Sequence, residues 1–161
     1  MSAEGTTAEE PHQAPVTGWG TFDAKGLGTL WLAWTDKGLL RLSFERLDGA
    51  LADEQAVPAV YTEPLRRYFD GEPEDFAAVP LDLRGTDFQI RVWNALRAIP
   101  WGQVRTYGGV AQEIQSPRAM RAVGQANHVN PIPVIVPCHR VVEAGHRLGG
   151  YGGGLERKEL L

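Results

Sequence analysis

The segment around Cys138, the single cysteine of the chain, has the residue types that nucleophilic chemistry needs. His139 and Arg140 follow the cysteine directly, in the run PCHRV. A cysteine that serves only packing needs neither an imidazole nor a guanidinium beside it, whereas both favour the reactive thiolate. A free cysteine is more often a small buried hydrophobic residue, but these neighbours favour a reactive thiol with a lowered pKa.

The composition limits the other chemistry that is available to the chain. One thiol cannot form an internal disulfide, and the sequence has neither a CxxC pair nor a cluster of Cys and His that would bind zinc. We therefore expect no metal and no cofactor. The apolar stretch 132–136 is far too short to cross a bilayer, and the N-terminus is polar and acidic. We expect a soluble, cytoplasmic protein with no membrane partner.

Charge is distributed unevenly between the two halves of the chain. Residues 1–85 carry 7 Lys/Arg against 15 Asp/Glu, a net charge of −8, whereas residues 86–161 carry 9 against 5, a net charge of +4. Eight of those nine cations are arginines, the side chain best suited to phosphate contacts and base stacking. The second half is therefore predicted to meet an acidic partner, although the whole chain is acidic at −4.

The elements that must position Cys138 can be predicted from the residues before it. Three prolines and a run of β-branched residues in NPIPVIVPCHRVV predict an extended chain that ends at the cysteine, at the edge of the structure. Successive side chains of an extended chain point to opposite faces. His139 would then need a turn or a bridging water to reach the sulfur.

Helices are predicted ahead of this segment. Thr86 and Gln89 fit a capping box for a helix that Pro100 ends, and Thr106 can cap a second helix through Ile114. Ser116 and Pro117 fit the start of a third helix, which runs to about His128. Its inward stripe is predicted to be Ala119, Ala122, Val123 and Ala126, and its outward stripe Arg118, Arg121 and Gln125. The last two helices resemble a helix-turn-helix, although outward arginines are also common on helices that bind nothing.

The N-terminal part has a different character. Residues 1–19 lack periodicity and read as a flexible tail, and residues 20–80 as a structural lobe. Alternating segments at 29–35 and 39–45 predict a hairpin, and Thr62 precedes a short helix with Pro64 in its first turn. No residues of this lobe cluster for chemistry, so we expect it to support the back of residues 81–161. The predicted class is α+β.

These residues carry a family resemblance. The run PCHRV, with Asn130 and Pro131 before it and GYGGGLERK after it, resembles the active-site segment of the bacterial O6-alkylguanine-DNA alkyltransferases. The similarity extends over residues 87–161 and more loosely over the hairpin lobe. It implies a small β-hairpin/α lobe packed on a helical, winged-helix-like DNA-binding domain. It also implies a monomer that flips O6-alkylguanine out of double-stranded DNA and transfers the alkyl group irreversibly to its own cysteine, with O4-alkylthymine as a second candidate substrate.

The resemblance also implies roles for single residues. Cys138 would be the alkyl acceptor, His139 would take its proton through water, and Asn130 would brace the turn that presents them. Tyr107 would press the DNA backbone and give its hydroxyl proton to guanine N3. Arg121 would enter the base stack in place of the flipped nucleotide.

The remaining roles concern the DNA contact and the base pocket. Arg118 would contact a phosphate, and the carbonyls of Cys138 and Val141 would accept from the guanine amino group. Tyr151 and the backbone N–H of Gly152 would line the pocket and donate to the released oxygen. Small residues would let the third helix approach the minor groove closely: Ala119, Ala122, Gly124 and Ala126.

Two points leave alternatives open. In the family a glutamate beyond the LERK-like segment orients the histidine, and its position falls after Leu161; Glu156 and Glu159 do not match it. Either the sequence is shortened at this end, or His139 works with less support. A non-catalytic alkyltransferase-like protein, which flags lesions, would carry another residue, commonly tryptophan, in place of Cys138. A transcriptional regulator that uses the helix-turn-helix alone would leave PCHR unexplained.

Overall fold

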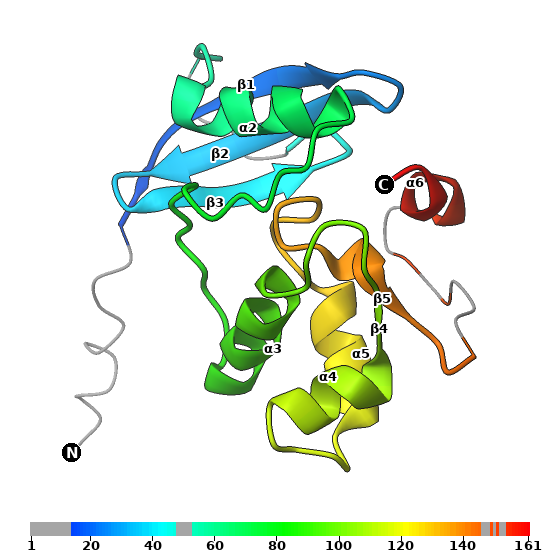
Figure 1. Cartoon of the computed structure of the whole chain (residues 1–161). Helices are drawn as coiled ribbons and strands as arrows, with labels where there is room; N and C mark the ends of the chain where they lie inside the picture. Colours follow the sequence, from blue (N-terminus) through cyan, green and yellow to red (C-terminus); the bar gives the residue numbers. More distant parts are fainter. Residues whose placement is uncertain (1–13, 48–52, 146–148, 150, 152–153) are drawn as a thin grey trace, which may run out of the picture.

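The N-terminal half of the structure is built around a small antiparallel sheet. The computed structural model describes residues 14–47, 53–145, 149, 151 and 154–161. The sheet contains, in chain order, β1 (Val16–Ala24), β2 (Gly28–Thr35) and β3 (Gly38–Ser43) (Figure 1). Thr35 pairs with Gly38, which leaves Asp36 and Lys37 as a two-residue turn. The predicted hairpin is therefore confirmed.

Strand β1 corrects the predicted tail. The tail was placed over residues 1–19, but Val16 to Trp19 belong to β1, which pairs with β2 from Val16 to Ala24 with an irregularity between Val16 and Gly18. Glycines at 18 and 20 concealed this strand, because glycine is normally depleted in strands. Gly20 is explained by a close backbone approach: a Cβ there would lie 2.2 Å from the Gln55 carbonyl oxygen. The neighbouring Trp19 carbonyl accepts from the Gln55 N–H at 2.8 Å.

Helix α2 (Ala59–Phe69) covers one face of the sheet (Figure 1). It begins at Ala59, before the predicted start at Thr62, so Pro64 lies inside the helix and not in its first turn. The proline costs the helix one backbone hydrogen bond. Burial offsets that loss, because Tyr61, Leu65 and Tyr68 form an inward stripe at spacings of four and three residues.

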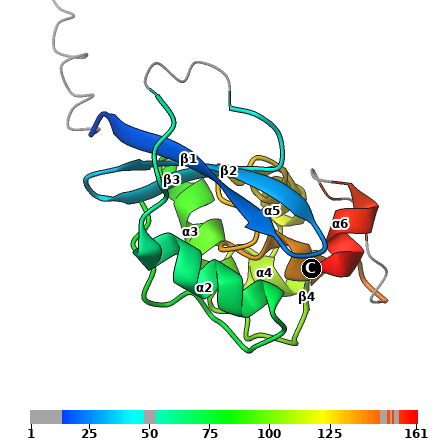
Figure 2. The same cartoon turned by 90° about the horizontal axis from the view of Figure 1, so that it is seen from above.

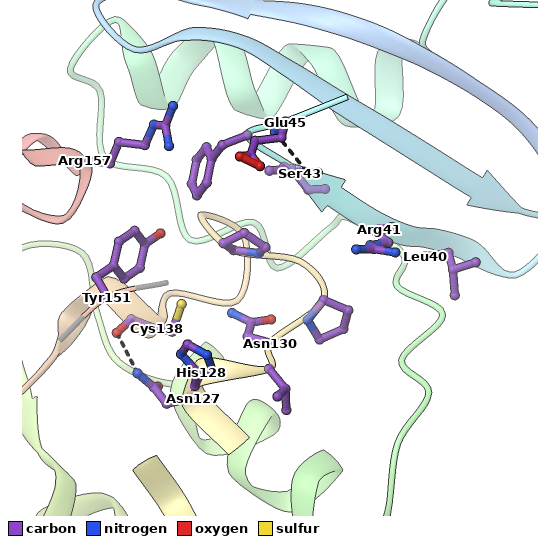
Figure 3. A pocket seen from close by; sticks show the side chains of 15 residues that line it. Leu40, Arg41, Ser43, Glu45, Asn127, His128, Asn130, Cys138, Tyr151 and Arg157 are labelled. Carbon is purple, nitrogen blue, oxygen red and sulfur yellow. Dashed lines mark hydrogen bonds between the residues drawn. The ribbon is translucent and has the colours of Figure 1, made fainter. Parts of the chain in front are cut away.

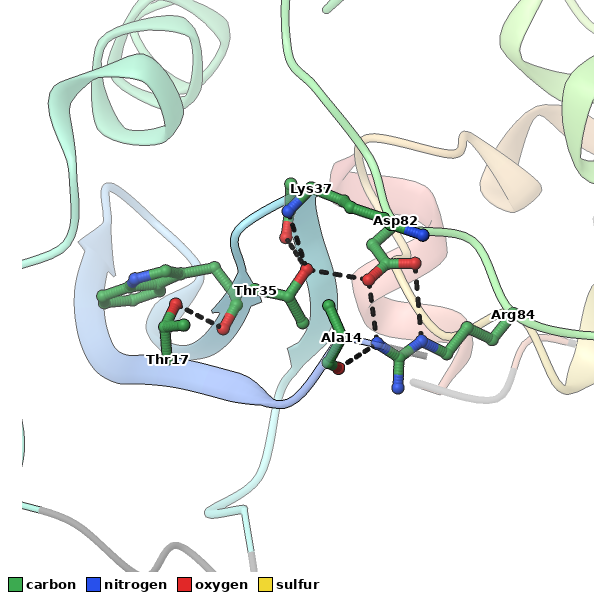
Figure 4. A network of polar contacts seen from close by, with 8 residues as sticks. Ala14, Thr17, Thr35, Lys37, Asp82 and Arg84 are labelled. Atoms are coloured by element: carbon green, nitrogen blue, oxygen red, sulfur yellow. Dashed lines mark hydrogen bonds and ion pairs between the residues drawn. The ribbon is translucent and has the colours of Figure 1, made fainter. Parts of the chain in front are cut away.

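The connection from α2 to the helical part runs along the end of the hairpin. Leu39 N–H donates to the Pro80 carbonyl at 2.9 Å, and Asp82 N–H donates to the Leu39 carbonyl at 2.8 Å. The Asp82 carboxylate accepts from the Thr35 hydroxyl at 2.7 Å and from the Arg84 guanidinium at 2.9 Å (Figure 4). These bonds tie the connection to the sheet.

Three helices form the body of the second half, on the other side of the connection. They are α3 (Asp87–Arg97), α4 (Tyr107–Glu113) and α5 (Met120–His128), and they lie beneath the sheet in the view of Figure 2. The predicted capping box of Thr86 and Gln89 is present, and the Thr106 hydroxyl accepts from the Gly109 N–H at 3.0 Å. Both helix starts are confirmed because they depend only on local bonds.

The predicted start of α5 is wrong. Ser116 and Pro117 form a turn, in which the Ser116 carbonyl accepts from the Ala119 N–H at 2.8 Å, and the helix begins only at Met120. Ala122 is exposed and not inward, whereas Val123 and Ala126 are buried as predicted. Because Ala126 is buried in the core, it does not belong to an outer approach surface.

The remaining elements are short. They are β4 (Arg105–Thr106), the 3-10 helix η1 (Cys138–Arg140), β5 (Val141–Val142) and α6 (Leu155–Leu160). β4 and β5 pair in parallel. The fold is therefore a mixed α and β structure, in agreement with the predicted class. Within the described residues, no helix has the length and apolar character that a membrane span requires.

Candidate active site

A tightly bonded loop, residues 130–137, delivers Cys138 to its place. The Asn130 side-chain amide donates to the Val136 carbonyl at 2.8 Å, and its oxygen accepts from the Ile132 N–H at 2.9 Å. Val136 N–H in turn donates to the Ile132 carbonyl at 2.9 Å. One side chain thus closes the loop from within, which is the bracing arrangement that the resemblance implies for Asn130.

The prediction of an extended chain before Cys138 is wrong. Residues 131–136 form bends and turns, and Val134 has φ of 75°, a conformation that costs a β-branched residue about 1–3 kcal/mol. Burial stabilises this strained loop, since Ile132, Val134 and Val136 are fully buried and Ile135 is 1% exposed. The apolar run that suggested a strand is therefore a buried loop.

Cys138 lies at the wall of a cavity of about 600 Å³. Its sulfur points into the cavity between the Tyr151 ring and the Asn130 side chain (Figure 3). The residue is only 4% exposed, so its predicted place at an edge is wrong. Burial raises the pKa of the thiol, while hydrogen bonding from Asn130 and Tyr151 and the charge of Lys158 oppose the rise. The predicted lowered pKa is therefore also wrong, and the resting thiol is protonated.

His139 is a buried, neutral imidazole. Burial, together with the positive charges of Arg140 and Lys158, lowers its pKa to about 3. Its Nε2 lies 3.1 Å from the hydroxyl oxygen of Tyr68 on α2. Its Nδ1 is buried and has no hydrogen-bond partner among the described residues. One ring nitrogen is thus held, and the other is open to accept a proton.

Two further side chains fix the turn that carries Cys138 and His139. Asn127 on α5 donates to the Cys138 carbonyl at 3.3 Å (Figure 3), and buried Arg140 donates to the Ile99 carbonyl, just beyond α3, at 2.8 Å. Nothing in the sequence distinguishes Asn127 from an ordinary helix residue. Val141, whose carbonyl was predicted to bind guanine, is fully buried in β5 and pairs with Arg105.

Two tyrosines approach the same site from other elements. Tyr107 is the first residue of α4, and burial raises its pKa, with further rises from the charges of Cys138 and Glu143. The Tyr151 hydroxyl is buried beside Cys138, and burial and Cys138 raise its pKa. The structure therefore brings both predicted tyrosines near the thiol. Gly152 lies outside the described residues.

The two predicted DNA-contacting arginines lie apart from the cavity. Arg121 is exposed in the first turn of α5, and Arg118 is exposed in the turn before it. Neither is among the described residues that line the cavity. Gln125 on α5 is exposed as well, so all three residues of the predicted outward stripe are exposed. Within the described ranges, no group of three or more His, Cys, Asp or Glu is placed to hold a metal ion.

Comparison with known proteins shows which family the chain belongs to. Residues 19–83 match the family description "6-O-methylguanine DNA methyltransferase, ribonuclease-like domain", and residues 87–161 match the "DNA binding domain" of the same name. A methylated-DNA–protein-cysteine methyltransferase of Methanosarcina acetivorans is 44% identical over 142 residues, covering 84% of this chain and 90% of that protein. The chain belongs to this methyltransferase family.

Other members differ in how much of their length is matched. The methylated-DNA–protein-cysteine methyltransferase of Mycobacterium bovis is 58% identical over 99 residues, and the match spans 59% of its length. The crystal structure of Mycobacterium tuberculosis OGT in complex with DNA is similar over 88% of both chains, with 45% identity and a TM-score of 0.76. The mixed α and β fold described above is thus the fold of this methyltransferase family.

Proposed function

We propose that this chain removes the alkyl group from O6-alkylguanine in duplex DNA and keeps it on Cys138. The observation that carries the proposal is a thiol at the wall of a cavity, directly followed by a neutral histidine with an open nitrogen. In the reaction the thiol gives its proton to His139, through water, and the sulfur attacks the alkyl carbon. The C–O6 bond breaks, its electron pair stays on guanine, and guanine takes up one proton.

The protein acts once per molecule. A thioether forms on Cys138, and the described residues include no group placed to cleave it. The balance of the step is one S–C bond formed and one C–O bond broken, so no oxidant, reductant or cofactor is consumed. Tyr107 would protonate guanine at N3, and the Val141 and Cys138 carbonyls would accept from its amino group. Tyr151 lines the cavity beside Cys138 and would form a wall of the base pocket, and the family resemblance assigns the Gly152 N–H to the released oxygen.

DNA binding is assigned to α4 and α5, as a helix-turn-helix of winged-helix-like character. Three observations support this assignment: the positive charge of residues 86–161, the exposure of Arg118 and Arg121, and the similarity to a relative solved with DNA. Extruding a base costs a few kcal/mol, and the cost is smaller for a poorly paired base. Arg121 would fill the vacated stack, while Arg118 would bind a phosphate.

We also propose how the chain is divided into two parts and where the protein works. Residues 16–80 form a structural lobe, residues 81–161 bind DNA and accept the alkyl group, and the protein works as a monomer in the cytoplasm. O4-alkylthymine is a second substrate to be tested. A lesion-flagging protein without transfer is the second candidate function, but the presence of Cys138 beside a proton-accepting His139 favours transfer.

Intact-protein mass spectrometry tests the proposal. Incubation with duplex DNA that carries one O6-methylguanine should add the mass of one CH₂ unit to the chain, on the peptide that contains Cys138. Cys138→Ser is the matched control and should bind the duplex without gaining mass. Binding without any adduct in the unmodified chain would instead identify a lesion-flagging protein.

A further inference from the structure

Tyr68 connects the N-terminal half of the chain to the reactive histidine. It lies on α2, is 8% exposed, and its ring packs edge-on against Phe69 with centroids 5.3 Å apart. Its hydroxyl makes two contacts: the Leu161 carbonyl oxygen at 2.9 Å and His139 Nε2 at 3.1 Å. The sequence assigned this part of the chain no chemistry, so the second contact is unexpected.

The number of hydrogens on these groups determines the direction of both hydrogen bonds of Tyr68. A phenol has a single hydrogen, and a backbone oxygen can only accept, so the Tyr68 hydrogen points to Leu161. The hydroxyl oxygen must then accept from His139, which places the imidazole hydrogen on Nε2. A neutral imidazole carries one N–H, so Nδ1 is bare. This nitrogen is the one that is buried without a partner among the described residues.

We propose that Tyr68 is a positioning residue of the alkyl-acceptor site, whose oxygen holds His139 in the tautomer that presents a bare Nδ1 to the Cys138 proton. The inference rests on the alkyl transfer proposed above. When Cys138 gives up its proton, Nδ1 gains it and the ring becomes an imidazolium. The bond from Nε2–H to the Tyr68 oxygen then becomes charge-assisted and strengthens. The proton is balanced by the one that the released guanine takes up.

The charges and the burial around His139 disfavour an imidazolium, so an acceptor at Nε2 is needed to stabilise it. Arg140 on the same turn and Lys158 on α6 place positive charge near the ring, and burial also disfavours the imidazolium. Glu159 on α6 lines the cavity on this side of His139, together with Tyr68 and Leu161. Tyr68 stays neutral over the working range, because burial raises its pKa more than Arg140 lowers it. Its oxygen is therefore the acceptor in direct contact with Nε2.

The test is the pH profile of single-turnover transfer by the full chain from duplex O6-methylguanine for Tyr68→Phe. This change keeps the packed ring and removes only the oxygen. Transfer at pH 7 should be roughly five- to thirtyfold slower, because a charge-assisted bond is lost as the imidazolium forms. The rising limb should move to higher pH by about one unit. The two profiles should converge at high pH, where the thiol ionises without the base.

The control is Tyr61→Phe, the same change at a buried tyrosine of α2 whose ring faces Trp34 at 6.1 Å. It should leave the profile in place. An equal loss at every pH in Tyr68→Phe, or the same loss in Tyr61→Phe, would show a structural role and overturn the proposal. ¹⁵N NMR of His139 in the unmodified chain gives a readout that needs no variant to fold: a hydrogen on Nδ1 would also overturn it. Absence of any adduct in the unmodified chain contradicts the alkyl transfer itself, which is a separate outcome.

Discussion

Cys138 rests as a protonated thiol, although its neighbours in the sequence favour a thiolate. Burial raises its pKa, and the nearby base is a neutral histidine. Since thiolates are the form that oxidants attack, a protonated resting state protects a group that the proposed alkyl transfer would use only once.

The burial of His139 should make the stability of the fold depend on pH. Its pKa is about 3 in the folded protein, against 6.5 in the unfolded chain, so between these values only the unfolded chain binds the proton. The free energy of unfolding should fall as the pH decreases below 6.5, by up to about 1.4 kcal/mol per pH unit. Urea denaturation between pH 6.5 and 5 measures this slope.

The same measurement on His139→Gln should show most of this slope of the unfolding free energy against pH removed. Between pH 6.5 and 5 carboxylates contribute little to it. His128→Gln, a change at an exposed histidine, should keep the slope of the unmodified chain. If all three proteins show the same slope, the folded His139 binds its proton as readily as the unfolded chain does, and the neutral imidazole assigned here is incorrect.

At the scale of single residues, the sequence could indicate the proposed reactive pair, Cys138 and His139, but not the residues that hold the pair in place. Cys138 and His139 are adjacent, so the run PCHR identifies them without any tertiary information. Tyr68 and Asn127 contact them from 71 and 11 residues away, through bonds that exist only once the chain is folded. Their types, a tyrosine and an asparagine in helices, predict packing or solvent exposure equally well.

Among the helices and loops, the predictions were correct where hydrogen bonds between residues close in sequence decide the structure. The starts of α3 and α4 were predicted because each cap is a bond between residues three apart. The shape of the loop 130–137 was not predicted, because it depends on the Asn130 side chain and on burial against the rest of the molecule. Pro117 was read as a first-turn proline, but a Ser-Pro pair also starts turns, and a turn is what forms there.

The exposed side of α5 leads to a prediction about base extrusion. Arg121→Ala should slow transfer from duplex O6-methylguanine by roughly ten- to hundredfold, since extrusion costs a few kcal/mol that the arginine helps to offset. Transfer from free O6-benzylguanine, which needs no extrusion, should change little. Single-turnover rates on the two substrates measure the difference, and equal losses on both would remove this role.

Arg118→Ala is the matched change in the turn before α5. A single phosphate contact should weaken binding evenly across sequences and reduce the slope of log affinity against log salt by about one unit. Titration of fluorescent duplexes at several salt concentrations measures the slope. A slope like that of the unmodified chain would mean that Arg118 does not contact the backbone.

For the molecule as a whole, the sheet and α2 must be held in register with the helical part, because α2 carries Tyr68. The connection at residues 80–84 does this by backbone bonds to Leu39 and by the Asp82 carboxylate. Burial by itself raises the pKa of Asp82, but hydrogen bonds from Arg84 and Thr35 and the charge of Arg84 hold it below its usual value. Two hydrogen-bond partners, Arg84 in the connection and Thr35 at the end of β2, thus keep the pKa of Asp82 low.

Replacing Asp82 should therefore affect both stability and transfer. Asp82→Ala leaves the buried Thr35 hydroxyl and the partly buried Arg84 without their shared acceptor, so the free energy of unfolding should fall by about 2–4 kcal/mol. Transfer at pH 7 should also slow, because α2 is held less firmly against His139. Glu72→Ala, a change at an exposed acid of the same connection, is the control and should alter neither quantity. A loss of stability with an unchanged transfer rate would mean that the network stabilises the fold without holding Tyr68 in place.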